Sequence, residues 1–280
     1  KTAYEISTRD WSSDVCSSDL ESAHSFGDCL FNLPLIKAIS LKHGVRPTVA
    51  VRAPYRDAFY NVPFINDIMI IDNWWDGINR FESMNYNIIH QLTQNHRFEE
   101  YKRTNPEHSL AETALCFGRS LGIEFDHRPM FFPTEDELSK AQAFINNIRK
   151  PIIAIEGIAR SGQSWIDRHA VGLIIERYHE SHSILWLSHE GKPDDHVIDM
   201  SPLTRRETIC ALRYANIFYS AGSGFFCSSM AIVPPHQPKR IVVMWRDETY
   251  KYEKHINMCK WHDDIVWTHN HEELVRSWQR

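Results

Sequence analysis

No stretch of this chain approaches the ~18 consecutive apolar residues that a transmembrane helix needs. No block of lysine and arginine is present either, and the formal net charge is −5. General nucleic-acid binding depends on neutralising phosphates with basic side chains, so this balance argues against a nucleic-acid partner. A small anionic ligand is compatible with it, because such a ligand needs only local hydrogen-bond donors.

Paired cysteines are also lacking. The six cysteines form no C-x-x-C motif and, outside residues 10–20, they are odd in number and widely spaced. This pattern argues against a disulfide framework or a zinc site and favours a reducing, cytoplasmic compartment. The densest histidine clusters, "KWHDD" (260–264) and "HNHEE" (269–273), resemble a polar turn and a helix start rather than metal-ligand spacing. We therefore predict no bound metal.

The segment "DWSSDVCSSDL" (10–20) has no helical or strand period. Back-translated with ordinary codons, it resembles a short-read sequencing adapter read in one frame. We therefore interpret it as adapter read-through, which is excluded from fold reasoning. The alternative is a polar, disordered tail. In both cases residues 10–20 are expected to contribute nothing specific to the fold, and residues 1–20 are expected to form an artefact or a disordered tail ahead of the first domain. Under the first interpretation a native first strand would be missing.

The rest of the chain alternates short apolar strands with helical patterns. Strands are expected at 47–54, 68–71, 86–92, 151–157, 183–191, 216–224 and 239–247, and helices at 29–43, 109–123, 134–150, 167–180, 204–215, 225–233 and 270–280. Such alternation is typical of parallel sheets covered by helices on both faces. The pattern restarts after Lys150-Pro151, so we expect an α/β fold with two doubly wound, Rossmann-like domains, 21–150 and 151–280, facing each other across a cleft. Ligands of such sheets bind beyond the carboxyl ends of the strands.

Several sequence segments follow one another in a characteristic order. They are Gly27-Asp28 with Pro34 in the following helix, then "VPFINDIMII", "PIIAIEGIARSGQSW" and "SPLTRRETICALRYANIFYSAGSGFFCSSMAI". In order and spacing, over about residues 24–247, these segments resemble the family 9 glycosyltransferases, the heptosyltransferase-like enzymes. No single motif carries the resemblance.

The resemblance implies a GT-B fold with a nucleotide-sugar donor held mostly on the C-terminal domain. It also implies sugar transfer with inversion and without a metal, the donor being a substrate and no cofactor being required. The acceptor, a saccharide or glycolipid, is expected on the N-terminal domain. A glycolipid acceptor would bring the protein into peripheral contact with a membrane.

Three positions depart from the family pattern. Gln163 stands where the family has the Lys of Lys-x-Trp, Gly222 where it has the Asp of the "N-D-[ST]-G" loop, and Cys227 where it has the His of "P-x-H". Those family residues help hold the phosphates and the sugar of the donor. The departures put ADP-heptose specificity in doubt and favour either another donor or a degenerate enzyme.

Asp28 is the candidate general base, because an inverting transfer needs a carboxylate to take the proton of the acceptor hydroxyl. The alternative is an acidic residue that only stabilises the N-terminus of the following helix. Position alone favours the alternative, and the family pattern around Asp28 favours catalysis.

Two loops are candidates for holding the diphosphate. "SAGSG" ends a strand and opens a helix, and its residues Ser220, Gly222, Ser223 and Gly224 would let backbone N–H groups approach phosphate. "ARSGQSW" offers Arg160, Ser161, Gly162 and Gln163, with Arg160 able to replace the missing lysine charge. Glu190 follows the strand "SILWLS", where many GT-B enzymes contact the nucleotide. The alternative for "SAGSG" is an ordinary strand–helix turn. The alternative for "ARSGQSW" is a solvated loop, and Glu190 could equally be an acid on a surface loop.

The first hypothesis is therefore an inverting, metal-independent glycosyltransferase. The second, motivated by the three departures, is a non-catalytic sugar-nucleotide or glycan-binding protein of the same fold. A third is another GT-B enzyme, such as a sugar-nucleotide epimerase, because fold alone does not fix function.

Overall fold

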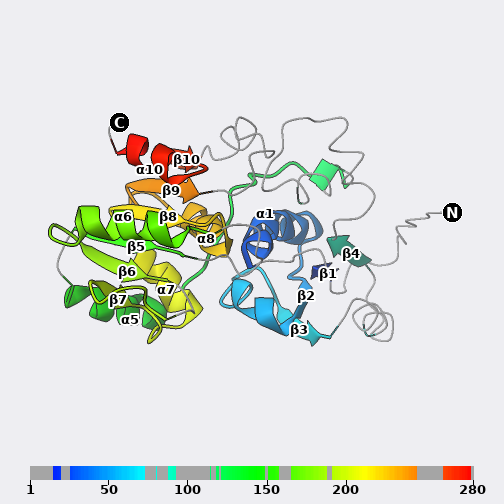
Figure 1. The fold of residues 1–280 in the computed structure, drawn as a ribbon. Helices are drawn as coiled ribbons and strands as arrows, with labels where there is room; N and C mark the ends of the chain where they lie inside the picture. The colour runs from blue at the N-terminus through cyan, green and yellow to red at the C-terminus, as the bar shows by residue number, and fades with distance from the viewer. Residues whose placement is uncertain are drawn as a thin grey trace. The chain divides into compact units, whose positions relative to one another are not determined.

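The computed structural model describes residues 15–19, 26–72, 80, 88–92, 114, 118–119, 121–148, 151–157, 165–187, 191–244 and 261–278. The chain divides into two compact units, Lys1–Phe132 (unit 1) and Pro133–Arg280 (unit 2). Each unit contains one parallel sheet (Figure 1). The expected α/β class is thereby confirmed.

The sheet of unit 1 has the order β3-β2-β1-β4. Its strands are β1 (Val15–Asp19), β2 (Thr48–Arg52), β3 (Asp67–Ile71) and β4 (Ile88–Leu92), all paired in parallel. The 3-10 helix η1 (Ala53–Ala58) follows β2, and the helix α1 (Phe26–His43) connects β1 to β2. The three strands expected in this half of the chain are therefore present.

Strand β1 lies inside the segment that the sequence suggested would stay outside the fold. It is a central strand: Ser17 pairs with Val49 of β2 on one side and with His90 of β4 on the other. The physical reason is that a β/α unit needs a strand ahead of α1, and backbone pairing can recruit any extended segment there. This pairing is independent of side-chain identity, so it is compatible with either origin of the segment.

Helix α1 contains a proline whose effect on the backbone is compensated. Pro34 has no N–H, so it cannot donate to the carbonyl of Leu30, the residue four positions earlier. Leu30 is fully buried, and its carbonyl accepts instead from the N–H of Met130 at 3.3 Å. A buried carbonyl without a partner would be costly. Pro34 thus leaves the Leu30 carbonyl free to accept a hydrogen bond that attaches the segment around Met130 to α1.

Unit 2 contains a six-stranded sheet in the order β10-β9-β8-β5-β6-β7. The elements, in chain order, are α5 (Glu135–Asn146), β5 (Ile152–Ile155), α6 (Arg168–Tyr178), β6 (Ser183–Trp186), β7 (Val197–Asp199), α7 (Arg205–Leu212), β8 (Ile217–Ser220), α8 (Gly224–Ala231), β9 (Arg240–Met244), β10 (Ile265–Thr268) and α10 (His271–Ser277). Strands β7 and β10 were not predicted from the sequence.

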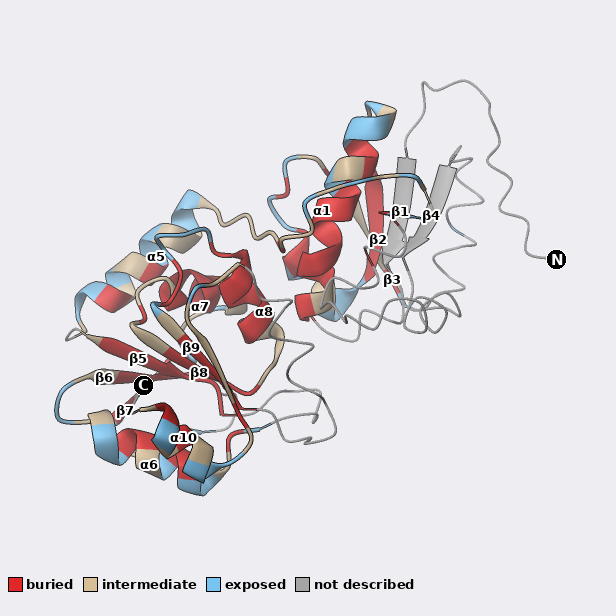
Figure 2. Cartoon of the chain, turned by 90° about the horizontal axis from the view of Figure 1, so that it is seen from above, coloured by how far each residue is buried: buried red, intermediate tan, exposed pale blue. Residues whose placement is uncertain are grey.

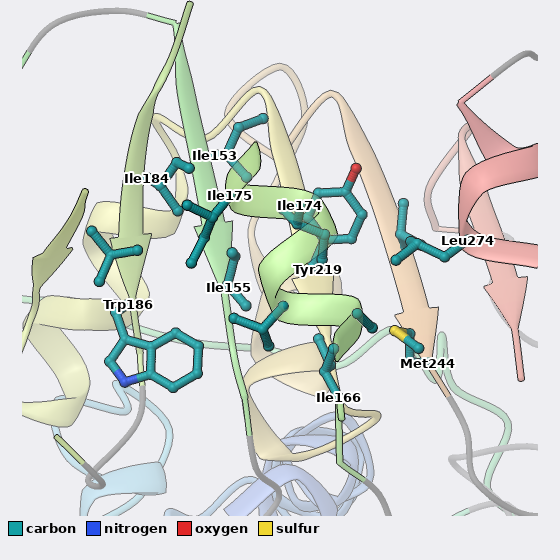
Figure 3. Packing of buried hydrophobic residues seen from close by; sticks show 14 of the residues in the cluster. Ile153, Ile155, Ile166, Ile174, Ile175, Ile184, Trp186, Tyr219, Met244 and Leu274 are labelled. Atoms are coloured by element: carbon teal, nitrogen blue, oxygen red, sulfur yellow. The ribbon is translucent and has the colours of Figure 1, made fainter. Parts of the chain in front are cut away.

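Helices cover both faces of this sheet, and the strands between them are buried (Figure 2). Helices α6 and α10 lie on one face, and α5, α7 and α8 on the other. The core against α6 and α10 includes Ile153, Ile155, Ile174 and Tyr219 (Figure 3). Because side chains alternate along a strand, Ile152, Ala154 and Glu156 point to the opposite face, toward α7 and α8.

The boundary between the units lies ahead of α5, not at Lys150-Pro151 as expected. The reason is that α5 packs on α7 within unit 2. The guanidinium of Arg206 on α7 donates to Glu137 on α5 at 2.6 Å, and both side chains are nearly buried. The capping box Thr134–Glu137, expected from the T-x-x-E pattern, is present at the start of α5.

The position of β1 leads to a test of unit 1. Ser17→Pro removes a backbone donor from a strand that has neighbours on both sides, where proline is not tolerated. We expect the unfolding free energy to fall by more than about 1 kcal/mol, the net contribution of a typical hydrogen bond. Urea denaturation of Ser17→Pro and of the matched control Ser17→Thr measures the effect. Equal stability of the two variants would show that the segment lies outside the fold.

Candidate functional site

The strand order of unit 2 reverses at its centre. From β5 the chain proceeds to β6 and β7 on one side, then returns to β8 beside β5 and continues to β9 and β10. The connections that leave β5 and β8 therefore diverge to opposite faces of the sheet. In open parallel sheets such a reversal point, at the carboxyl ends of the strands, is where ligands bind.

A buried carboxylic acid lies at this reversal point. The register pairs Ile155 of β5 with Tyr219 of β8, so the next residues, Glu156 and Ser220, are neighbours on the face covered by α7 and α8. Glu156 is only 2% exposed, and its N–H donates to the carbonyl of Tyr219 at 2.8 Å. Its side chain thus points under the turn that joins β8 to α8 (residues 220–224, the β8–α8 turn).

The carboxyl group of Glu156 holds this turn through several donors. The hydroxyl of Ser220 donates to Oε2 at 2.8 Å, and the hydroxyl of Ser223 donates to Oε1. The N–H of Ala221 contributes a further hydrogen bond. Ser220 is fully buried. Both edges of the carboxyl group are therefore occupied by groups of one short turn.

Burial raises the pKa of Glu156 to about 7, although the hydrogen bonds from Ser223, Ser220 and the Ala221 N–H favour the ionised form. Removing a carboxylate from water disfavours its charge more than these neutral donors compensate. The described surroundings contribute no charged partner to this shift. Glu156 is consequently a buried acid with a raised pKa, and it lies where open parallel sheets generally bind ligands. A perturbed pKa in such a place is typical of functional sites.

The β8–α8 turn leads into the N-terminus of a helix and is held by its own hydrogen bonds. Ser223 caps α8, its hydroxyl accepting from the N–H of Phe225 at 3.0 Å. Gly222 has a φ of +66°, a left-handed conformation that glycine adopts without strain. Its N–H donates to the hydroxyl of Ser220 at 3.2 Å. Helix N-termini of this kind favour anions, phosphate among them.

The glycine that follows Glu156 has a packing role. A Cβ atom added at Gly157 would lie 2.2 Å from the ring of Trp186, at the carboxyl end of β6. Trp186 is 5% exposed and belongs to the core beside α6 (Figure 3). The glycine at the start of the loop after β5 is thus required by this tryptophan, which occupies the place of a side chain.

The structure brings together part of the predicted site. Ser220, Gly222, Ser223 and Gly224 form one turn, as the sequence suggested. Arg160, Ser161, Gly162, Gln163 and Glu190 lie outside the described residues. Cys227, at the position of the family histidine, is buried in α8 with 8% exposure.

Asp28 belongs to unit 1, in the first turn of α1, and is half-buried between the buried Gly27 and Cys29. Glu156 was missed by sequence reasoning. The signal that could have found it is an acidic residue directly after a fully apolar strand, "IIAIE", ahead of a glycine.

Two searches of the described residues bear on metals and membranes. Within the described ranges, no group of three or more His, Cys, Asp or Glu side chains gathers as metal ligands would. Among the same residues, no helix combines the length and the apolar character that crossing a bilayer requires.

The pKa of Glu156 predicts how stability depends on pH. Between pH 4.5, its ordinary pKa, and about 7, the folded chain binds more protons at this group than the unfolded chain. The stability that it contributes is present below that window and is lost as pH rises through it. Glu156→Gln removes this loss, so its stability relative to the parent should increase by up to about 3 kcal/mol between pH 4.5 and 8, at ~1.4 kcal/mol per pKa unit.

Urea denaturation of both proteins at several pH values measures this difference. The difference isolates Glu156, because every other titrating group is common to the two chains. Parallel curves of stability against pH would contradict the raised pKa.

No family model matches the chain, and no curated protein matches its sequence. Solved structures do resemble it. The glycosyl transferase family 9 structure from Veillonella parvula has a TM-score of 0.67 at 11% identity, covering 96% of this chain and 90% of that one. The E. coli heptosyltransferase WaaC with ADP has a TM-score of 0.59 at 11% identity, covering 95% and 97%. The E. coli ADP-heptose lps heptosyltransferase II has a TM-score of 0.58 at 12% identity, covering 91% and 90%.

These likenesses span nearly the whole chain in each case, and at such identities they concern the fold. The chain has the GT-B-type fold of the family 9 glycosyltransferases.

Proposed function

We propose that this chain is an inverting, metal-independent glycosyltransferase that moves a sugar from a nucleotide-activated donor to a saccharide or glycolipid acceptor. The donor is a substrate, and no cofactor takes part. The observation that carries the proposal is the β8–α8 turn, held from below by Glu156 at the reversal point of the unit 2 sheet. This place and this backbone suit the diphosphate of a nucleotide sugar.

The roles of the donor site follow from its charges. The N-terminus of α8, with its helix dipole, would stabilise the negative charge that grows on the departing nucleoside diphosphate. Arg160, Ser161, Gly162 and Gln163 are proposed as further contacts to the phosphates, and Glu190 as a contact to the nucleoside. Among the solved structures of this fold, WaaC was determined with ADP, which supports a nucleotide as the ligand class.

Asp28 is proposed as the general base. The acceptor hydroxyl would attack the anomeric carbon as the bond from that carbon to the diphosphate breaks. The hydroxyl proton would pass to the Asp28 carboxylate, so the product sugar has the opposite anomeric configuration. Asp28 lies in the first turn of α1, where the positive end of the helix dipole favours a negatively charged side chain.

A non-catalytic sugar-nucleotide or glycan-binding protein is the second candidate. Two described departures from the family pattern favour it. Gly222 offers no carboxylate on the turn, and Cys227 replaces a polar imidazole with a buried thiol. A chain with these changes could keep the backbone that binds a diphosphate while losing side chains that act on the sugar.

Asp28→Asn decides between the two candidates. The amide keeps the size of the side chain but cannot take a proton, and general-base catalysis contributes about 10²–10⁴-fold. We expect single-turnover transfer, measured across a panel of nucleotide-sugar donors and sugar acceptors, to slow by that order. Nucleotide affinity should change little, because the phosphates are assigned to unit 2. Stability should change by a few tenths of a kcal/mol at most, since Asn also suits helix starts.

Transfer by the Asn variant at the rate of the parent would remove Asp28 from catalysis. Nucleotide binding by the parent without transfer to any acceptor would favour the binding protein. Absence of both would contradict a nucleotide-sugar function altogether.

A further inference from the structure

Glu156 takes no part in the chemistry proposed above, yet it is the most deeply buried acid of unit 2 that the structure describes. An uncompensated buried carboxylate is destabilising, and a glutamine or an apolar residue would avoid that cost. The carboxyl group of Glu156 therefore lowers the stability of the fold when it is ionised. Its hydrogen bonds go to the turn that the proposed function assigns to the diphosphate. This coincidence calls for a role connected with the ligand.

We propose that Glu156 is a positioning residue for the nucleotide donor, whose carboxyl group shapes the β8–α8 turn and takes up a proton from solvent when the anionic diphosphate binds. The inference rests on the proposed function, because it assigns the diphosphate to this turn. It adds a regulation of the site by pH, carried by a residue beneath the turn rather than on it.

The hydrogen bonds form two chains that lead from Glu156 to the backbone of the turn. In one chain Ser220 donates to the carboxyl group and accepts from the N–H of Gly222. In the other, Ser223 donates to the carboxyl group and accepts from the N–H of Phe225. Each hydroxyl thus connects Glu156 to a backbone donor, Gly222 in the turn and Phe225 in the first turn of α8.

Protonation of Glu156 changes what these hydroxyls can do. An ionised carboxylate only accepts, so it keeps both serine hydrogens pointed down toward itself. A protonated carboxyl group can donate its own hydrogen to the oxygen of Ser223, which is only partly buried, and this frees the Ser223 hydroxyl to donate elsewhere. A phosphate above the turn is such an acceptor. The neutral form of Glu156 therefore offers the ligand one more donor than the ionised form does.

Charge acts in the same direction. A diphosphate bound at this turn would repel an ionised carboxylate beneath it, and burial leaves little water to screen the repulsion. The pKa of Glu156, already about 7 from burial, should therefore rise when the ligand binds. On the described elements that pack around this group, the ionisable side chains are Tyr219 of β8, Cys227 of α8 and, on α7, Arg205, Arg206, Glu207 and Cys210. Arg206 pairs with Glu137 and Glu207 with Lys140. Burial also raises the pKa of Tyr219, which keeps that phenol neutral.

The test measures nucleotide binding by calorimetric titration with ADP, UDP and GDP, at pH values from 5 to 8 and in buffers of different ionisation enthalpy. The parent should take up as much as about half a proton from solvent per bound nucleotide near pH 7 and less at pH 5, where Glu156 is already protonated. Glu156→Gln should bind with less proton uptake, and its affinity should exceed that of the parent at pH 8. Each unit of pKa coupling corresponds to a tenfold change in affinity.

Two further variants separate positioning from stability. Glu156→Ala removes the acceptor of both serine hydroxyls, whereas Gln keeps an oxygen that accepts, so the affinity of the Ala variant should be lower than that of the equally neutral Gln variant at every pH. The matched control is Glu137→Gln, another nearly buried glutamate of unit 2, which pairs with Arg206. It should lower the melting temperature and leave nucleotide affinity and proton uptake unchanged.

The outcomes distinguish this inference from the function on which it rests. Failure of the parent to bind any of the three nucleotides would overturn the proposed function and the inference with it. Binding with the same proton uptake and pH dependence in the parent and Glu156→Gln would overturn the inference alone. Equal affinities of Glu156→Ala and Glu156→Gln would do the same.

Discussion

The hydrogen bonds between the Glu156 carboxyl group and the two serines of the β8–α8 turn are the interaction on which the site depends. They join the ends of β5 and β8, the two strands at which the sheet of unit 2 reverses direction. The connections that follow β5 and β8 diverge from each other. The first residues of these two connections therefore need an interaction that holds them together. A buried acid does this while remaining sensitive to any charge that arrives above it.

The surrounding structure fits this constraint. Alternation along the strands sends Ile153 and Ile155 into the core against α6 and leaves the opposite face of β5 for Glu156. Gly157 then has no side chain, because Trp186 fills that space. Glu156 belongs to the polar network on one face of the sheet, and Gly157 to the packing on the other face. These two requirements explain why the apolar strand β5 is followed by Glu-Gly.

Sequence reasoning predicted much of this fold and part of the site. Apolar strands alternating with helices identified the parallel sheets, and "SAGSG" was correctly placed between a strand and a helix. The boundary ahead of α5 was missed because it depends on the Arg206–Glu137 pair, between residues far apart in the chain. Glu156 was missed for the same reason: its partners become neighbours only through the register of β5 and β8. Strand β1 was missed because its polar sequence carries no strand pattern, and its place is set by the sheet.

The central claim is that the β8–α8 turn is where a nucleoside diphosphate binds. Hydrogen–deuterium exchange of the parent protein, with and without a saturating nucleotide selected by calorimetry, tests it directly. The account predicts slower exchange on binding in peptides that cover Ser220–Phe226, with no change in peptides from α5. Protection confined to other parts of the chain, with the turn unaffected by a bound nucleotide, would contradict it.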